Sequence, residues 1–228
     1  MKILVSIVTT NKNYFKKIQE LKKLKVKEVA LFLTLYATKS VREKIYKELY
    51  KNNIKNVPFV HLRDDMKLEE IDYLIKKFNT KLFNTHTKQD HGIKDKRIFK
   101  KYKNLIYLEN TNQYIKNEIN NYAGICLDVS HLENARRCKK KSYKIVSEIL
   151  KNYKCGVWHV SAIRRKAYKC SHSKVLRYDD HTFHSLTEFD YLKKYKKYLP
   201  KYIAFEVENS IEEQLKAKKY ISKLLIKK

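Results

Sequence analysis

Short apolar runs recur along the whole chain, and each is followed by a lysine-rich segment whose apolar residues recur at three-to-four spacing. The first pattern predicts a buried β-strand, and the second predicts an amphipathic helix that packs its apolar face against the strands. Eight strands are expected, at residues 3–8, 29–37, 57–62, 81–86, 105–110, 124–129, 156–162 and 202–209.

Strict alternation of strand and helix implies that the strands are parallel. Eight units of about 25 to 30 residues fit a closed barrel better than an open doubly wound sheet, and no glycine-rich nucleotide-binding motif follows any strand. We therefore predict an α/β protein, a (β/α)₈ TIM barrel, in which residues 1–228 form a single domain. The fifth and sixth strands lie close in sequence, so their connection can hold only one or two helical turns.

The charge balance is strongly basic, with 52 lysines and arginines against 24 acidic residues and a formal net charge of +28. Such a surface attracts polyanions, which makes DNA a candidate partner. A lysine-rich composition spread along the chain also fits surface ion-pair networks that have nothing to do with binding. Charge alone therefore does not decide the function.

Cysteine use and hydropathy indicate the compartment. The four cysteines show no CxxC spacing, and two of them lie in or beside apolar runs, as expected for free thiols in a reducing environment. The opening segment lacks the features of a signal peptide, and no apolar run is long enough to cross a membrane. A cytoplasmic protein without a membrane span is expected.

Ionisable side chains stand at the carboxyl ends of six predicted strands, where TIM barrels carry their active sites. They are His61, His86, Glu109, Asp128 with His131 three residues later, His159 and Glu206. Several carboxylates gathered at one barrel mouth repel one another unless cations neutralise them. Mixed imidazole and carboxylate ligands favour zinc, manganese or iron over calcium or magnesium, so a transition metal is expected.

At these residues the sequence resembles the xylose isomerase-like TIM barrels and, within them, endonuclease IV. The segments LENT (108–111), GICLDVSH (124–131), WHVSA (158–162) and AFEVEN (204–209) are similar to that superfamily's motifs at strands five to eight. The resemblance covers roughly residues 55–210. It implies a central divalent ion held by Glu109, Asp128, His159 and Glu206.

The similarity to endonuclease IV implies up to three zinc ions, with Mn²⁺ as an alternative, and hydrolysis of DNA phosphodiester bonds at abasic or damaged sites. One flanking ion would be held by His61, His86 and Glu109. The other would be held by His131, Asp179 and His181. Asp180 with His184 is an alternative alignment for this last pair, and Glu208 is a rival to Glu206.

A basic segment precedes Asp179, and four of its cations are expected to contact nucleic-acid or substrate phosphates, namely Arg164, Arg165, Lys166 and Arg177. A solvated lysine-rich loop is the alternative. Two other functions stay open for the whole chain. A sugar isomerase or epimerase would need one ion and would use Glu109 and Glu206 as a proton-shuttling pair. A non-catalytic, basic nucleic-acid-binding barrel would need none.

Overall fold

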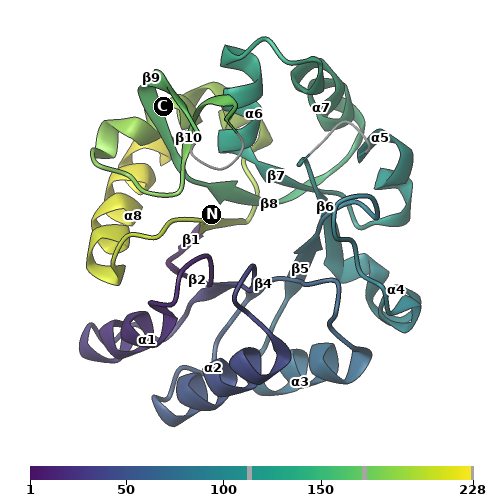
Figure 1. The fold of residues 1–228 in the computed structure, drawn as a ribbon, viewed down its shortest axis with the longest axis vertical. Coiled ribbons are helices and arrows are strands. Elements are labelled where there is room, and N and C mark those ends of the chain that lie inside the picture. Colours follow the sequence, from purple (N-terminus) through teal and green to yellow (C-terminus); the bar gives the residue numbers. More distant parts are fainter. Residues whose placement is uncertain (112–114, 171–173, 227–228) are drawn as a thin grey trace.

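The computed structural model describes residues 1–111, 115–170 and 174–226. Nine short parallel strands form one sheet that rolls into a nearly closed barrel, and the helices surround it on the outside (Figure 1). The predicted fold, an α/β TIM barrel of a single domain, is confirmed. None of the described helices combines the length and apolarity that crossing a membrane requires.

The predicted first strand is divided in two at Val5. Its first part, β1 (Lys2–Leu4), pairs with the last barrel strand, and its second part, β2 (Ser6–Val8), pairs with β3. This division closes the ring and raises the strand number above the expected eight. The other barrel strands are β3 (Ala30–Phe32), β4 (Phe59–His61), β5 (Leu82–Thr85), β6 (Ile106–Glu109), β7 (Ile125–Asp128), β8 (Cys155–Val160) and β11 (Tyr202–Phe205).

The helices follow the strands in the predicted order. They are α1 (Tyr14–Lys23), α2 (Lys39–Lys51), α3 (Leu68–Phe78), α4 (Lys96–Tyr102), α5 (Ile115–Glu118), α6 (Val129–Arg137), α7 (Lys141–Asn152) and α8 (Ile211–Ile226), with 3₁₀ segments η1 (Lys103–Leu105), η2 (Ile119–Asn121) and η3 (Leu186–Tyr198). The short connection between β6 and β7 is confirmed as α5 and η2. The segment before β11, expected to be an amphipathic helix, is wound as 3₁₀ helix instead.

Packing inside the barrel orients the side chains at its mouth, the end where the strands have their carboxyl termini. Side chains that alternate along the strands point inward and form a small apolar cluster of Leu4, Val8, Ala30, Phe32, Phe59, Leu82, Cys126, Val157 and Ala204. Residues two positions further along a strand share its face. His61, Asp128, His159 and Glu206 each stand two positions after a member of this cluster, so the packed interior orients them toward the mouth.

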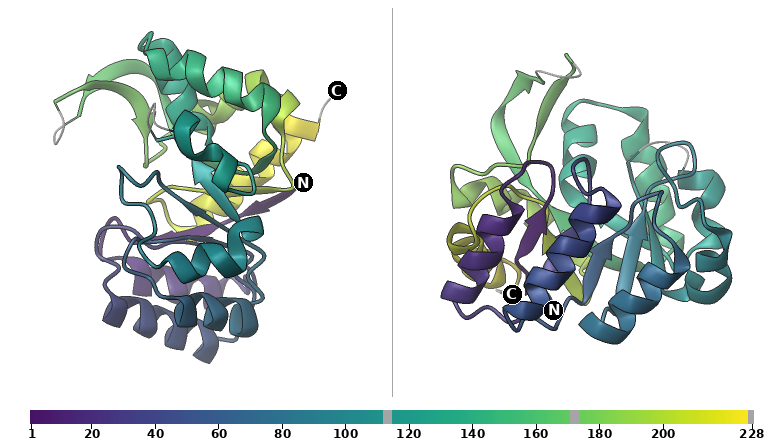
Figure 2. Two further views of the ribbon diagram at one scale, coloured as in Figure 1. Left: turned by 90° about the vertical axis from the view of Figure 1, so that its right-hand side faces the viewer. Right: turned by 60° about the horizontal axis from the view of Figure 1, so that its bottom comes forward.

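A two-stranded antiparallel arm, β9 (Ala162–Lys169) with β10 (Leu176–Asp180), follows β8 and projects away from the barrel (Figure 2). The basic segment expected as a loop therefore forms a β-ribbon. Pairing of its two halves satisfies backbone groups that would otherwise need water. The ribbon begins directly after Ser161, so it rises from the side of the barrel where the strands end.

Candidate metal centre

Four side chains from separate strands converge at the centre of the mouth. Ligand atoms of Glu109, Asp128, His159 and Glu206 all lie within 4.8 Å of one another. His159 Nδ1 lies between the two glutamates, 3.5 Å from Glu109 Oε2 and 3.4 Å from Glu206 Oε2. The arrangement matches the group expected to hold a central ion.

Three atoms of this central group are buried and have no hydrogen-bond partner in the described part of the chain: Asp128 Oδ2, His159 Nδ1 and Glu206 Oε2. Buried polar atoms in folded proteins almost always have a partner. All three belong to side chains that aim at the same point, and a cation there would satisfy them together. The donor set of one imidazole and three carboxylates thus fits a divalent ion.

Asp128 is held so that one carboxylate oxygen remains available. As the N-cap of α6, its Oδ1 accepts hydrogen bonds from the backbone N–H of His131 and from the hydroxyl of Ser130, both at 2.7 Å. Asn110 clamps its backbone by donating to the Asp128 carbonyl and accepting from its N–H. The run GICLDVSH therefore ends on a helix cap that presents Oδ2 to the centre.

Below the centre, His159 rests on aromatic side chains and a thiol. The rings of Phe32 and Phe59 meet the imidazole edge-on, with centroids 4.7 and 5.2 Å away. Cys126 Sγ lies 3.1 Å from His159 Nε2. For Nδ1 to bind an ion, Nε2 must carry the proton and donate it to Sγ, so the thiol selects the tautomer that binds metal.

This contact leads to a first prediction. Cys126→Ala removes the acceptor for His159 Nε2–H, and we expect the affinity for the divalent ion to fall by about 10-fold to 100-fold, as for other lost partners of metal-binding histidines. Titration of the purified protein with Mn²⁺ measures the change. Cys155→Ala is the matched control and should leave the affinity unchanged. Equal affinities in wild type and Cys126→Ala would exclude this role for the thiol.

A second group shares Glu109 with the first. His61 Nε2 lies 3.1 Å from His86 Nε2 and 3.2 Å from Glu109 Oε2. His61 Nδ1 lies 3.0 Å from the carbonyl of Leu62 and can donate to it, which leaves Nε2 unprotonated toward the mouth. The structure therefore brings together potential ligand atoms of the expected flanking group, His61, His86 and Glu109.

The electrostatics of the mouth favour charged carboxylates at two of three positions. Burial alone would raise the pKa of Glu109, but the imidazoles of His159 and His86 outweigh it and hold that pKa well below its usual range. Burial is likewise outweighed at Glu206, where His159 and His181 lower the pKa to about 2. Burial raises the pKa of Asp128, and the nearby carboxylates of Glu206 and Glu109 add to this effect, which His131 and His159 only partly offset.

The third expected group is less compact. His131 Nδ1 lies 2.8 Å from Asp179 Oδ2, while His181 Nδ1 lies 2.9 Å from the backbone carbonyl of Glu206. The rings of His131 and His181 are 6.4 Å apart between centroids, and this trio is absent from the tight ligand groups of the described residues. Asp179 also pairs with Arg177, so its carboxylate is already engaged on two sides.

Contacts distinguish the positions of the alternative residues. His184 is exposed and Asp180 pairs with Arg164, so Asp179 and His181 are the residues that face the mouth. The Glu208 carboxylate accepts a hydrogen bond from Thr10 Oγ1 at 2.6 Å, outside the central group. Glu206 therefore takes the inward position.

The four cations expected to bind phosphate lie on the β9–β10 arm in two different environments. Arg164 pairs with Asp180 and stacks on Tyr168, with 4.5 Å between its guanidinium carbon and the ring centroid. Arg177 pairs with Asp179 at the base of the arm. Arg165 and Lys166 are exposed. Only the last two are therefore presented to solvent as unshielded cations.

Sequence reasoning missed the residues that hold the ligands in place. Asn84 donates to Glu109 Oε2 at 2.6 Å, and Cys126 contacts His159. A signal was present, since Asn84 and Cys126 stand two positions before His86 and Asp128 and so share their strand faces. The clamp by Asn110 had no comparable signal, because it depends on how two neighbouring loops meet.

No protein-family model matches the chain, and no curated protein matches it either. Solved structures do match the chain, and two of them align over nearly its whole length. A xylose isomerase-like TIM barrel protein from Mycobacterium smegmatis in complex with magnesium aligns with a TM-score of 0.52 and 10% identity, over 98% of this chain and 97% of that chain. A D-tagatose 3-epimerase-like protein aligns with a TM-score of 0.50 and 12% identity, over 99% of this chain and 97% of that chain.

The chain has the fold of the xylose isomerase-like TIM barrels. The fold that the strand-end motifs implied is thereby confirmed, and the structural match extends to the first two strands, which only the pattern of apolar runs had suggested. Closeness to endonuclease IV remains a prediction. At 10% and 12% identity the likeness concerns the fold, so the chemistry of this xylose isomerase-like barrel has to be argued from its own side chains.

Proposed function

We propose that the protein is a divalent-metal-dependent isomerase or epimerase that acts on a sugar or sugar phosphate. The observation that carries the proposal is the central group of Glu109, Asp128, His159 and Glu206, with three buried ligand atoms that lack a partner among the described residues. This alternative was secondary in the sequence-based interpretation. It becomes the main one because the central group, which brings four ligand residues together, is sufficient for this chemistry.

Two of these side chains are suited to holding the ion, and the other two are suited to proton transfer. Asp128 and His159 are fixed by the cap of α6 and by Cys126, which suits them to hold and orient an ion. A bound divalent ion polarises a carbonyl or hydroxyl oxygen of the substrate. Glu109 and Glu206 lie on two sides of His159 Nδ1, so they can also reach a substrate from two sides.

In the proposed reaction one of these glutamates removes the proton from the carbon next to a ketose carbonyl. The other returns a proton to the same carbon from the opposite face for epimerisation, and the proton goes to the neighbouring carbon for isomerisation. Proton loss and gain balance, so no redox partner is required. A glutamate carboxylate is ionised at neutral pH, so either residue can accept this proton.

The comparisons support the same class. One aligned structure is named as D-tagatose 3-epimerase-like, and the other contains magnesium. Three carboxylates and one imidazole suit Mn²⁺ and also accommodate Mg²⁺. Manganese is therefore our first choice of ion, ahead of zinc.

Hydrolysis of DNA phosphodiester bonds, as in DNA repair, is the second candidate. One observation favours it: His61 and His86 form an additional ligand group on Glu109, which a single-ion isomerase does not use. Zinc at adjoining sites would activate water and neutralise phosphate oxygens. The basic arm, with Arg165 and Lys166 exposed, would suit contacts with a phosphate backbone.

One set of assays separates the candidates. Metal-loaded protein is incubated in D₂O with ketoses and ketose phosphates, and deuterium uptake next to the carbonyl is followed by NMR. We expect uptake that is lost in Glu206→Gln and retained within about tenfold in His86→Ala, because the latter residue lies outside the central group. Elemental analysis should give one ion per chain.

The same preparations are tested for nicking of a duplex with one abasic site. No deuterium uptake from any substrate, together with nicking that His86→Ala abolishes, would reject the isomerase and establish the nuclease. Two or three zinc ions per chain would agree with that second outcome. The basic barrel without catalytic activity corresponds to neither uptake nor nicking.

A further inference from the structure

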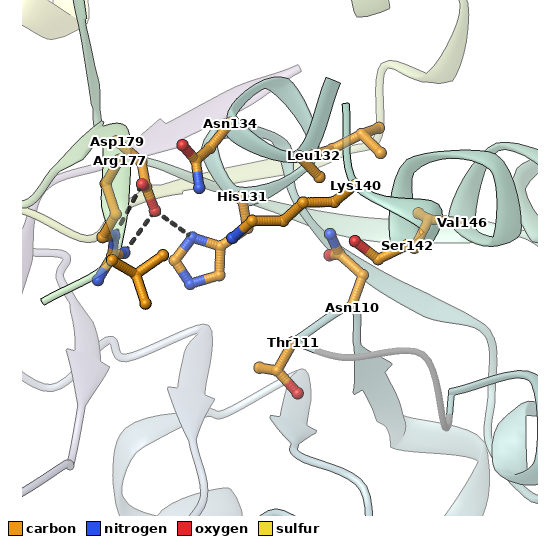
Figure 3. A pocket seen from close by; sticks show the side chains of 12 residues that line it. Asn110, Thr111, His131, Leu132, Asn134, Lys140, Ser142, Val146, Arg177 and Asp179 are labelled. Carbon is orange, nitrogen blue, oxygen red and sulfur yellow. Dashed lines mark hydrogen bonds and ion pairs between the residues drawn. The ribbon is translucent and has the colours of Figure 1, made fainter. Parts of the chain in front are cut away.

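A cavity of about 270 Å³ lies next to the metal centre, between α6, the start of α7 and β10 (Figure 3). It is separate from the central ligand group but shares a wall with it, because His131 lines the cavity and its Nδ1 lies 3.6 Å from Asp128 Oδ2. The polar part of its lining is formed by one carboxylate, Asp179, and by Asn110, Thr111, His131, Asn134, Lys140, Ser142 and Arg177. Hydrogen-bond donors and cations therefore dominate this wall.

Asn134 is the most informative of these residues. It is 5% exposed, and its side-chain oxygen accepts a hydrogen bond from the backbone N–H of Tyr178 at 2.9 Å. That bond fixes the orientation of the amide, so its NH₂ group must point the other way. Figure 3 shows the nitrogen directed into the cavity, and no described residue accepts from it. The Asn134 side chain thus offers the cavity an N–H donor that has no acceptor among the described residues, and an oxygen of a ligand can supply one.

The cations around this donor leave capacity for an anion. Lys140 is exposed, extends over the cavity and makes no ion pair with a described carboxylate. Arg177 uses Nε and Nη2 on Asp179, which leaves its Nη1 hydrogens free of the described ion pairs. Asp179 is itself shared between Arg177 and His131, so its negative charge is compensated.

The start of α7 adds backbone donors. This helix is 12 residues long, its N-cap is Lys140, and no side chain caps its first turn. Unpaired N–H groups at a helix start favour bound phosphate, and Ser142 in that turn contributes a hydroxyl to the cavity. The cavity thus offers an amide, a hydroxyl, backbone N–H groups and two cationic side chains.

We propose that this cavity binds the phosphate group of the substrate, which makes the substrate a phosphorylated sugar. The inference rests on the proposed isomerase or epimerase function and narrows its substrate class. A phosphate offers several acceptor oxygens and up to two negative charges, which matches the donors better than a neutral hydroxyl does. Because one side chain, His131, separates the cavity from Asp128, a sugar can reach the ion while its phosphate stays in the cavity.

The binding test uses inorganic phosphate and then a pentose phosphate as probes, with the full chain loaded with Mn²⁺. Lys140→Gln removes a cation, and Asn134→Asp keeps the oxygen that holds Tyr178 while it replaces the inward amide by a carboxylate. We expect each variant to weaken phosphate binding about tenfold or more by calorimetry, as loss of a charge-assisted hydrogen bond does. Lys144→Gln, an exposed lysine of α7 outside the cavity, is the matched control and should change it less than twofold.

Two further measurements identify the molecule that supplies the phosphate group. For the pentose phosphate, Lys140→Gln should raise KM about tenfold and leave kcat within twofold, while turnover of the unphosphorylated pentose stays the same. An abasic oligonucleotide should not displace inorganic phosphate at concentrations where the pentose phosphate does. Displacement by the oligonucleotide alone, or unchanged phosphate binding in both cavity variants, would overturn the proposal.

The phosphate site can be tested independently of the proposed isomerase or epimerase function. Glu206→Gln should lose turnover and keep phosphate affinity, since it lies outside the cavity lining. If phosphate binds as expected but no sugar phosphate exchanges deuterium, the isomerase proposal fails and the phosphate site stands. If deuterium exchange occurs with neutral sugars and phosphate binding is unchanged in the cavity variants, the phosphate site fails and the isomerase proposal stands.

Discussion

Glu109→Gln is expected to lower kcat/KM for the proposed isomerisation by at least about a thousandfold, the upper part of the range for loss of a general base. Glu109 Oε2 lies 3.2 Å from His61 Nε2 and 3.5 Å from His159 Nδ1, so this one oxygen belongs to both ligand groups. The amide keeps the size of the side chain and removes its charge and basicity. Deuterium uptake by metal-loaded protein measures the loss.

The matched control is Glu208→Gln. Glu208 is a second glutamate of the same segment, but its carboxylate is held by Thr10 and lies outside the central group. It should therefore retain activity within about twofold to threefold of wild type, as expected for a charge outside the reacting centre. Equal losses in both variants would show that general charge at the mouth, and not the position of Glu109, governs the rate.

Binding of Mn²⁺ is expected to raise the melting temperature by about 5 to 10 °C at an ion concentration one hundred times the dissociation constant. Such binding stabilises the folded state by about 2.7 kcal/mol. For a chain of about 230 residues each kcal/mol corresponds to roughly 2 to 4 °C. The physical source is the neutralisation of three clustered carboxylates and the satisfaction of the unpartnered atoms Asp128 Oδ2, Glu206 Oε2 and His159 Nδ1.

A double variant, Asp128→Asn with Glu206→Gln, tests this explanation in a differential scanning experiment with and without Mn²⁺. It should show no shift on addition of the ion, since two of the four ligands have lost their charge. A shift as large as that of wild type would mean that the ion binds elsewhere.

Strand parity made the residues of the metal centre predictable from the sequence. Alternation places Cys126 and Asp128, or Ala204 and Glu206, on one face of a strand, and parallel strands bring their carboxyl ends to one rim. The apolar members of these pairs lie in the barrel interior, as this reasoning requires. The positions of His61 and His86 at the rim follow in the same way, because each ends its own predicted strand.

Loops and connections were less predictable, because their conformation depends on partners that are distant in sequence. The basic segment was expected to be a loop, but its two halves pair as β9 and β10. Engagement of Arg164 and Arg177 by Asp180 and Asp179 follows from that pairing and partly neutralises two of the four expected phosphate ligands. The amide of Asn134 points into a cavity only because β10 occupies its oxygen.

The sequence by itself determined that strands and helices alternate, that the strands are parallel, and that acids and imidazoles stand where those strands end. These features are local, since hydrophobic periodicity and strand parity act within a few residues. The tertiary structure alone decided the division of the first strand at Val5, the choice of Glu206 over Glu208, and the cavity beside His131. The first two depend on closure of the barrel, which brings together residues from opposite ends of the chain, and the cavity depends on the contact between β10 and α6, which no local pattern encodes.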